Sequence, residues 1–166
     1  TSNNVMNDTL FHLIKPQSLL AWQRVRLASA MAHSGEEWWT TFKRSASGTY
    51  VNQYMIVDFK PFQPGHALKP GTLWVVEEIP GLVAGADVTE TLTRGYWPSY
   101  NVPYFPEVYK RSGYDREDVQ RGLGDDASYE LAPRAKIFRR DQATVTDMTT
   151  FKRIMRYNNY LKDPYS

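Results

Sequence analysis

The 166-residue chain is 42% apolar and 23% charged, which predicts one folded domain and argues against a disordered segment. Its net charge of +2 is too small to indicate nucleic acid or an anionic membrane as a partner, and no apolar run approaches the ~20 residues of a membrane span. The chain has no cysteine, and therefore no disulfide, thiolate metal site or cysteine nucleophile of its own.

The first predicted helix covers residues 19–31. Its apolar residues fall near one face, which we expect to be buried: Leu20, Leu27, Ala28 and Met31. Arg24 interrupts that face. A buried or snorkelling arginine with a carboxylate partner is the structure that this pattern predicts.

A capping-box pattern at residues 34–37 predicts the start of a second helix, with Ser34 as its N-cap. In this helix Trp38, Trp39 and Phe42 stand at contact spacing, which is more typical of core packing than of a ligand platform. We expect the helix to end at Ser47-Gly48.

Three strands are predicted at residues 49–59, 72–79 and 82–86, because these runs are rich in β-branched and aromatic residues and are bounded by Pro and Gly. Short turns between them predict antiparallel pairing. Both faces of the first strand are largely apolar, so both should be covered. Helices on one side and a second sheet on the other would cover them.

The second half of the chain predicts short helices around an ordered loop. The loop, residues 96–105, is rich in Tyr, Trp and Pro. The expected helices are a brief one that Asp87 and Glu90 cap and that ends at Gly95, two near residues 107–111 and 116–121, and a last one over residues 148–157 with Asp147 as N-cap. The order of elements predicts an α+β fold.

No strong motif for a metal or a nucleotide is present. The three histidines lack metal-ligand spacing, and His12, in an apolar run, is expected to be a core residue. Asp125-Asp126 is more typical of a solvated turn than of a calcium site. We therefore expect no cofactor and no metal.

Thr1 raises the alternative of an N-terminal nucleophile, because such enzymes use a first-position Thr with its α-amine as base. The other interpretation is that the chain only happens to begin there. Residues 1–4 and 163–166 carry neither a signal nor a closing cap, so we expect both ends to be cuts through a larger protein.

Five stretches carry a far more specific signal. They are SGTYVNQ at 47–53, EIPG at 78–81, GYWPSYNVP at 95–103, LAPRAKIFRRDQ at 131–142, and MRYNNY followed by DPYS within 155–166. In this order along the whole chain, they resemble the motifs of phospholipase B-like proteins. Val51 and Glu78 depart from the pattern, which has Asn and Gln there.

The resemblance implies an αββα sandwich of the N-terminal-nucleophile hydrolase type, of which residues 1–166 are a partial domain. Its nucleophile is a cysteine that precursor cleavage exposes upstream of Thr1, so that Thr1 falls inside a strand. Asn101 matches an active-site asparagine able to stabilise an oxyanion. Arg134 matches a site arginine that lowers the thiolate pKa or holds a polar substrate group. Ser2 stands where the family has a site Thr.

The activity implied is hydrolysis of acyl ester or amide bonds in a lipid-derived substrate. The alternatives are a non-catalytic binding protein with the same fold and a free-standing interaction module. From the residues alone, Asn101 and Arg134 would be interpreted as buried structural groups. The resemblance also implies a lysosomal or secreted location, association with the remaining segments of the same precursor, and a homodimer. Asn7, in the sequon Asn7-Asp8-Thr9, is then a glycosylation site.

Overall fold

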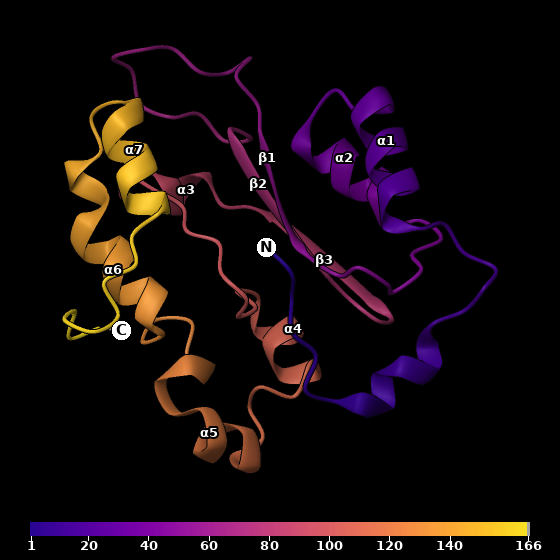
Figure 1. The fold of residues 1–166 in the computed structure, drawn as a ribbon. Helices are drawn as coiled ribbons and strands as arrows, with labels where there is room; N and C mark the ends of the chain where they lie inside the picture. The colour runs from indigo at the N-terminus through magenta and orange to yellow at the C-terminus, as the bar shows by residue number, and fades with distance from the viewer. Residues whose placement is uncertain (166) are drawn as a thin grey trace.

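The fold is α+β, as predicted: a small antiparallel sheet with helices around it (Figure 1). This computed structural model describes residues 1–165. The strands β1 (Gln53–Val57), β2 (Leu73–Ile79) and β3 (Leu82–Asp87) lie in the order β1–β2–β3, and both neighbouring pairs are antiparallel. The helices α1 (Ala21–Met31) and α2 (Gly35–Phe42) lie together against one side of the sheet (Figure 1).

The first strand is shorter than the sequence pattern indicated. It begins later than residue 49 because the backbone is left-handed at Gly48 (φ 72°) and Tyr50 (φ 52°), which a strand cannot accommodate. It ends before residue 59 because the Asp58 carboxylate accepts a hydrogen bond from the Lys60 N–H at 2.9 Å, which folds the chain into a turn. The predicted β2 and β3 agree with the structure to within one residue.

Helix α1 forms as predicted but buries a different face. Its buried residues are Ala21, Arg24 and Ala28. Of the four residues of the predicted apolar face, Ala28 is buried as predicted, whereas Leu20, Leu27 and Met31 are exposed, so the prediction was wrong for these three. The reason is the buried ion pair between Arg24 and Glu78 of β2, in which one guanidinium nitrogen lies 2.7 and 3.0 Å from the two carboxylate oxygens. This pair turns the arginine toward the sheet, and the leucines away from it.

Helix α2 begins at the predicted N-cap, where the Ser34 hydroxyl accepts a hydrogen bond from the Glu37 N–H at 3.2 Å. Its core role is confirmed: the rings of Trp38 and Phe42 stack with centroids 4.7 Å apart, and both are buried against the sheet. The helix ends earlier than predicted, since the chain becomes left-handed at Ser45 (φ 51°).

The other face of the sheet is covered by a loop where we predicted a second sheet. The residues in contact are Leu73 and Val75 of β2 and Trp97, Tyr104 and Phe105 of the loop. On β1 the same face is half open, with Met55 and Val57 each 49% exposed. Residues 1–165 contain one sheet, and its second cover is the predicted aromatic loop.

The remaining elements are short. They are η1 (Asp8–Leu13), α3 (Thr89–Leu92), α4 (Pro106–Arg111), α5 (Glu117–Leu123), η2 (Gly124–Ala127), α6 (Pro133–Asp141), η3 (Gln142–Thr144) and α7 (Met148–Met155). The helices predicted near α4, α5 and α7 are confirmed, and Asp147 caps α7 by accepting the Thr150 N–H at 2.7 Å. Helix α6 was not predicted, although Pro133 in its first turn is a helix-start signal.

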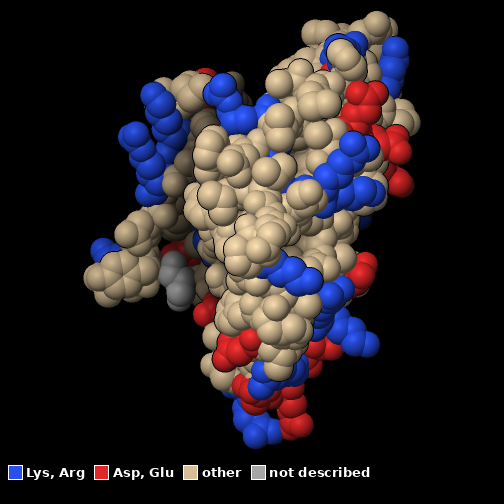
Figure 2. All heavy atoms as spheres, turned by 90° about the vertical axis from the view of Figure 1, so that its right-hand side faces the viewer, with Lys and Arg blue, Asp and Glu red and all other residues tan. Residues whose placement is uncertain are grey.

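No helix in residues 1–165 is long and apolar enough to cross a membrane. Figure 2, which faces the side that carries α1, shows a broad uncharged area with charged side chains toward its edges. Exposed apolar side chains of α1 include Trp22 and Met31. Surfaces of this kind are typical of contact with other protein.

Candidate functional site

The first three residues run beside β1 like an added strand. The Gln53 N–H donates to the Thr1 carbonyl at 2.7 Å, and the Asn3 N–H donates to the Val51 carbonyl at 3.0 Å. Ser2, between them, forms an isolated antiparallel bridge with the residue before Gln53. This pairing places the backbone of Ser2 at the edge of the sheet, next to the aromatic loop.

Asn101 lies half-buried in that loop and makes two side-chain hydrogen bonds. Its Nδ2 donates to the Ser2 carbonyl at 2.7 Å, and its Oδ1 accepts from Nη2 of Arg134 at 2.9 Å. The loop backbone is held in turn by the Tyr114 hydroxyl, which donates to the Asn101 carbonyl at 2.8 Å. An amide nitrogen carries two N–H groups. Within residues 1–165 this nitrogen donates only to Ser2, so its second N–H is available for another acceptor.

Arg134 comes from the first turn of α6, the helix that the sequence analysis missed. The neighbouring Ala135 is buried in a cluster with Tyr100 and Val102, which fixes α6 against the loop. Arg134 itself is exposed. The structure therefore brings Ser2, Asn101 and Arg134 together, although Asn101 and Arg134 are 33 residues apart in the chain. Interpreting Arg134 as a buried structural group does not fit its exposure.

Ser2 takes part through its backbone carbonyl, not through the hydroxyl that would replace the family's Thr. The neighbouring hydroxyl of Thr1 lies 2.8 Å from the hydroxyl of Ser99.

A buried carboxylate holds the loop that carries Asn101. Glu77 of β2 is fully buried and accepts hydrogen bonds from the backbone N–H groups of Tyr104 and Phe105 at 2.8 and 2.9 Å. Its cross-strand partner Gln53 donates to it at 2.8 Å and accepts from the indole N–H of Trp97 at 3.3 Å. Burial raises the pKa of the Glu77 carboxyl, and the three donated hydrogen bonds oppose this shift. The loop is therefore fastened to the sheet on both sides of Asn101.

We expect Glu77→Gln to destabilise the full-length protein by about 1–3 kcal/mol. Both oxygens of Glu77 accept hydrogen bonds, and the glutamine replaces one of them with an NH₂ group. The N–H groups that donated to that oxygen are then buried without an acceptor. Thermal or urea unfolding measures the loss. The matched control is Glu107→Gln on the exposed start of α4, which should leave stability within ~0.5 kcal/mol. Equal effects of the two substitutions would contradict the fastening role of Glu77.

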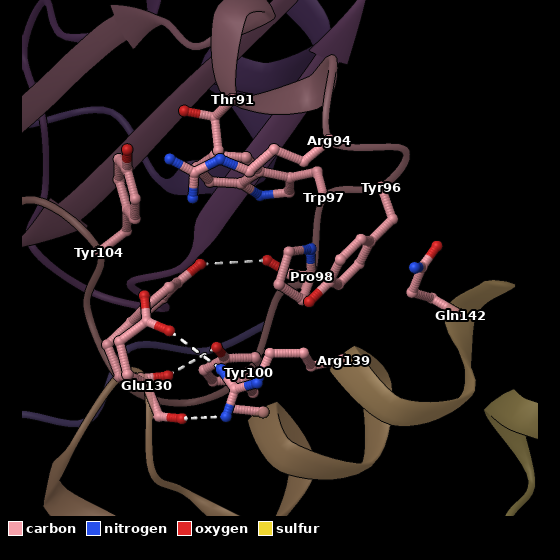
Figure 3. Close-up of a pocket in the computed structure, with 12 residues that line it drawn as sticks. Thr91, Arg94, Tyr96, Trp97, Pro98, Tyr100, Tyr104, Glu130, Arg139 and Gln142 are labelled. Atoms are coloured by element: carbon pink, nitrogen blue, oxygen red, sulfur yellow. Dashed lines mark hydrogen bonds and ion pairs between the residues drawn. The ribbon is translucent and has the colours of Figure 1, made fainter.

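Beside this site the loop borders a cavity of about 430 Å³ (Figure 3). Five of its twelve lining residues are aromatic, and Arg94 and Arg139 come from opposite sides of the close-up (Figure 3). Arg139 is paired with Glu130, whose carboxylate and backbone carbonyl accept at 3.1 and 3.0 Å. The Tyr100 hydroxyl donates to the Tyr129 carbonyl at 2.6 Å. These bonds stabilise the cavity wall between α6 and the loop.

Three further expectations have structural outcomes. His12 is exposed at the end of η1, so the prediction of a core histidine was wrong; Leu10 is the buried residue of that segment. Asn7 is half-exposed, and its Oδ1 accepts from the Thr9 hydroxyl at 2.7 Å. Asp125 pairs with Lys136 at 2.6 Å, and residues 1–165 contain no cluster of three metal-ligating side chains.

Comparison with known proteins assigns the chain to a family. The family model described as Phospholipase B matches residues 1–166. The chain belongs to the phospholipase B family. Similar proteins are Phospholipase B-like 1 of Bos taurus (55% identical), Phospholipase-B 81 of Drysdalia coronoides (54%) and Phospholipase B-like protein B of Dictyostelium discoideum (48%), in each case over all of this chain.

The phospholipase B relatives are much longer than this chain. It spans 30% of the bovine and Drysdalia proteins and 29% of the Dictyostelium protein. Their names, Phospholipase B-like for two of them and Phospholipase-B for the third, belong to whole proteins of that length.

Proposed function

We propose that the full-length protein is a phospholipase B-like hydrolase of acyl ester or amide bonds, and that this chain supplies one wall of its active site. The observation that carries the proposal is the hydrogen-bonded chain from Arg134 through Asn101 to the Ser2 carbonyl. It gathers the matched family residues from three distant parts of the sequence at one accessible place.

The proposed chemistry uses a cysteine thiolate from outside this chain. The thiolate attacks the acyl carbonyl carbon, and negative charge develops on the carbonyl oxygen. The free N–H of Asn101 donates to that oxygen, while Arg134 keeps the amide turned so that its nitrogen faces the site. The alcohol or amine then leaves as the acyl-thioester forms, and water releases the acid and regenerates the thiol. In this scheme Thr1 is a bystander.

The wider setting belongs to the same proposal. Residues 1–166 form part of an αββα N-terminal-nucleophile domain, completed by the remaining segments of the precursor, and the protein resides in the lysosome or is secreted as a homodimer. The half-exposed Asn7 carries its glycan in that compartment. Support comes from the family membership and from the exposed apolar side chains of α1, Trp22 and Met31 among them, which are typical of a protein interface.

The alternative of a non-catalytic binding protein rested on the departures Val51 and Glu78. Glu78 lies on the face of β2 that packs on α1, where it binds Arg24. Its neighbour Glu77 faces the aromatic loop, on the opposite side of the strand. Glu78 is therefore explained by the core ion pair and does not alter the candidate site, which favours the enzyme.

The test uses the full-length protein and a matched pair of long-chain acyl substrates, one ester and one amide. Asn101→Ala should lower kcat for whichever bond is cleaved by about 100–1000-fold, the range known for removal of one oxyanion donor. The melting temperature of the variant, measured beside the parent's, separates lost chemistry from lost folding. Unchanged hydrolysis by a folded Asn101→Ala protein would overturn the proposed role.

A further inference from the structure

The candidate site continues into an apolar groove of about 590 Å³ that the catalytic proposal does not use. Its walls come from β1, the start of the aromatic loop, the end of α6 with η3, and α7. The apolar residues among them are Met55, Tyr96, Trp97, Phe138, Val145, Phe151, Ile154 and Met155. None of the residues that line the groove is charged.

Helix α7 gives one wall of this groove its exposed apolar surface. Phe151 and Met155 lie one turn apart on the helix and are 46% and 57% exposed. Met55 of β1, which also lines the groove, is 49% exposed. Methionine side chains are flexible and polarisable, so they adapt to apolar ligands of varying shape. A soluble ligand with its own charges would find no partner along this wall.

The polar end of the groove meets the candidate site. Thr1 and Ser99 line the groove and bind each other through their hydroxyls. Thr1 precedes Ser2, whose carbonyl receives the Asn101 amide, and Ser99 lies two residues before Asn101 in the loop. A ligand whose apolar part fills the groove can therefore place its head at Thr1 and Ser99, on the side of the groove toward Asn101.

We propose that this groove binds a single acyl chain of the substrate, with the reacting carbonyl at the Ser99 end and the methyl end between α6 and α7. The orientation, though not the binding itself, rests on the proposed hydrolase function. A peptide is a poorer occupant, because its backbone groups would need hydrogen-bond partners that an uncharged, mostly apolar wall does not supply. A hydrocarbon chain needs none and buries apolar surface on both sides.

Binding of cis-parinaric acid, a fluorescent long-chain fatty acid, to the full-length protein tests the proposal without requiring turnover. Met155→Lys should weaken binding at least about tenfold, because the acyl chain would have to strip water from an ammonium group in the groove wall. Met148→Lys is the matched control: Met148 lies on the same helix, is 64% exposed and does not line the groove. It should change the affinity less than about twofold.

Two further measurements keep the outcomes distinct. Ala143→Phe, which fills the groove from η3, should weaken binding as Met155→Lys does, even if one of the two variants folds poorly. Hydrolysis of the acyl ester and amide substrates, measured on the same proteins, reports separately on the proposed chemistry. Failure of the parent to bind, or equal binding by the Met155→Lys and Met148→Lys proteins, would overturn the groove proposal while leaving the hydrolase proposal intact. Loss of hydrolysis alone would leave the groove intact.

Discussion

Replacing Arg24 with methionine should destabilise the full-length protein by about 3–5 kcal/mol, because Glu78 would be left as a buried carboxylate without its cation. Arg24 is 1% exposed and Glu78 is fully buried. The guanidinium also donates to the carbonyls of Leu19 and Phe42 at 2.9 and 3.1 Å. One side chain thus joins α1, the end of α2 and β2.

The double variant Arg24→Met, Glu78→Gln should recover much of this loss. Burial raises the pKa of the Glu78 carboxyl against the opposing effect of Arg24, and a neutral amide avoids the charge while it still accepts from the Gly48 N–H. Arg121→Met, which breaks an exposed pair with Glu117, is the surface control and should cost less than ~1 kcal/mol. Urea unfolding measures all three. A single Arg24→Met variant as stable as the Arg121→Met control would show that the buried pair does not hold the fold.

The second large effect concerns Arg134, which we expect to act through Asn101. Arg134→Ala should lower kcat by about 10–100-fold, because the amide is no longer held with its nitrogen toward the site. The double variant Asn101→Ala, Arg134→Ala should be no slower than Asn101→Ala alone, because residues that act as a unit are not additive.

Arg134→Lys separates this positioning role from a purely electrostatic one. A lysine retains the charge but lacks the planar fork that fixes the amide, so it should restore only part of the lost kcat. Arg139→Ala, on the same helix and paired with Glu130, is the control and should leave kcat within about threefold. If the fold-loss of kcat in the Asn101→Ala, Arg134→Ala double variant equalled the product of the two single losses, Arg134 would instead contact the thiolate or the substrate directly.

Local signals predicted most of the elements correctly. Ser34 and Asp147 are N-caps because each is a short polar side chain before a helical run, a purely local pattern. The three strands follow from β-branched and aromatic runs between turns. The failures have tertiary causes. The rotation of α1 depends on Glu78, which lies 54 residues away in the chain, and α6 is short and highly charged, so its packing against the loop gives no apolar periodicity to detect.

The candidate site, too, was predicted in part and missed in part. Its residues Ser2, Asn101 and Arg134 were named through a resemblance to family motifs, whereas Glu77 and Gln53, which hold the loop, were missed. A signal for them existed: paired polar residues at facing positions of two apolar strands need a buried partner. The strand sequences do not show that the partner is the backbone of the aromatic loop.

The sequence by itself determined the family, the order of helices and strands, and the identity of the matched site residues. Only the tertiary structure decided which face of α1 is buried, what covers the second face of the sheet, and how Asn101 is oriented between Arg134 and the Ser2 carbonyl. The physical reason is how far apart in the chain the interacting groups lie. Caps and strand patterns depend on neighbours in the chain, while a buried ion pair or an amide orientation depends on groups that folding alone brings together.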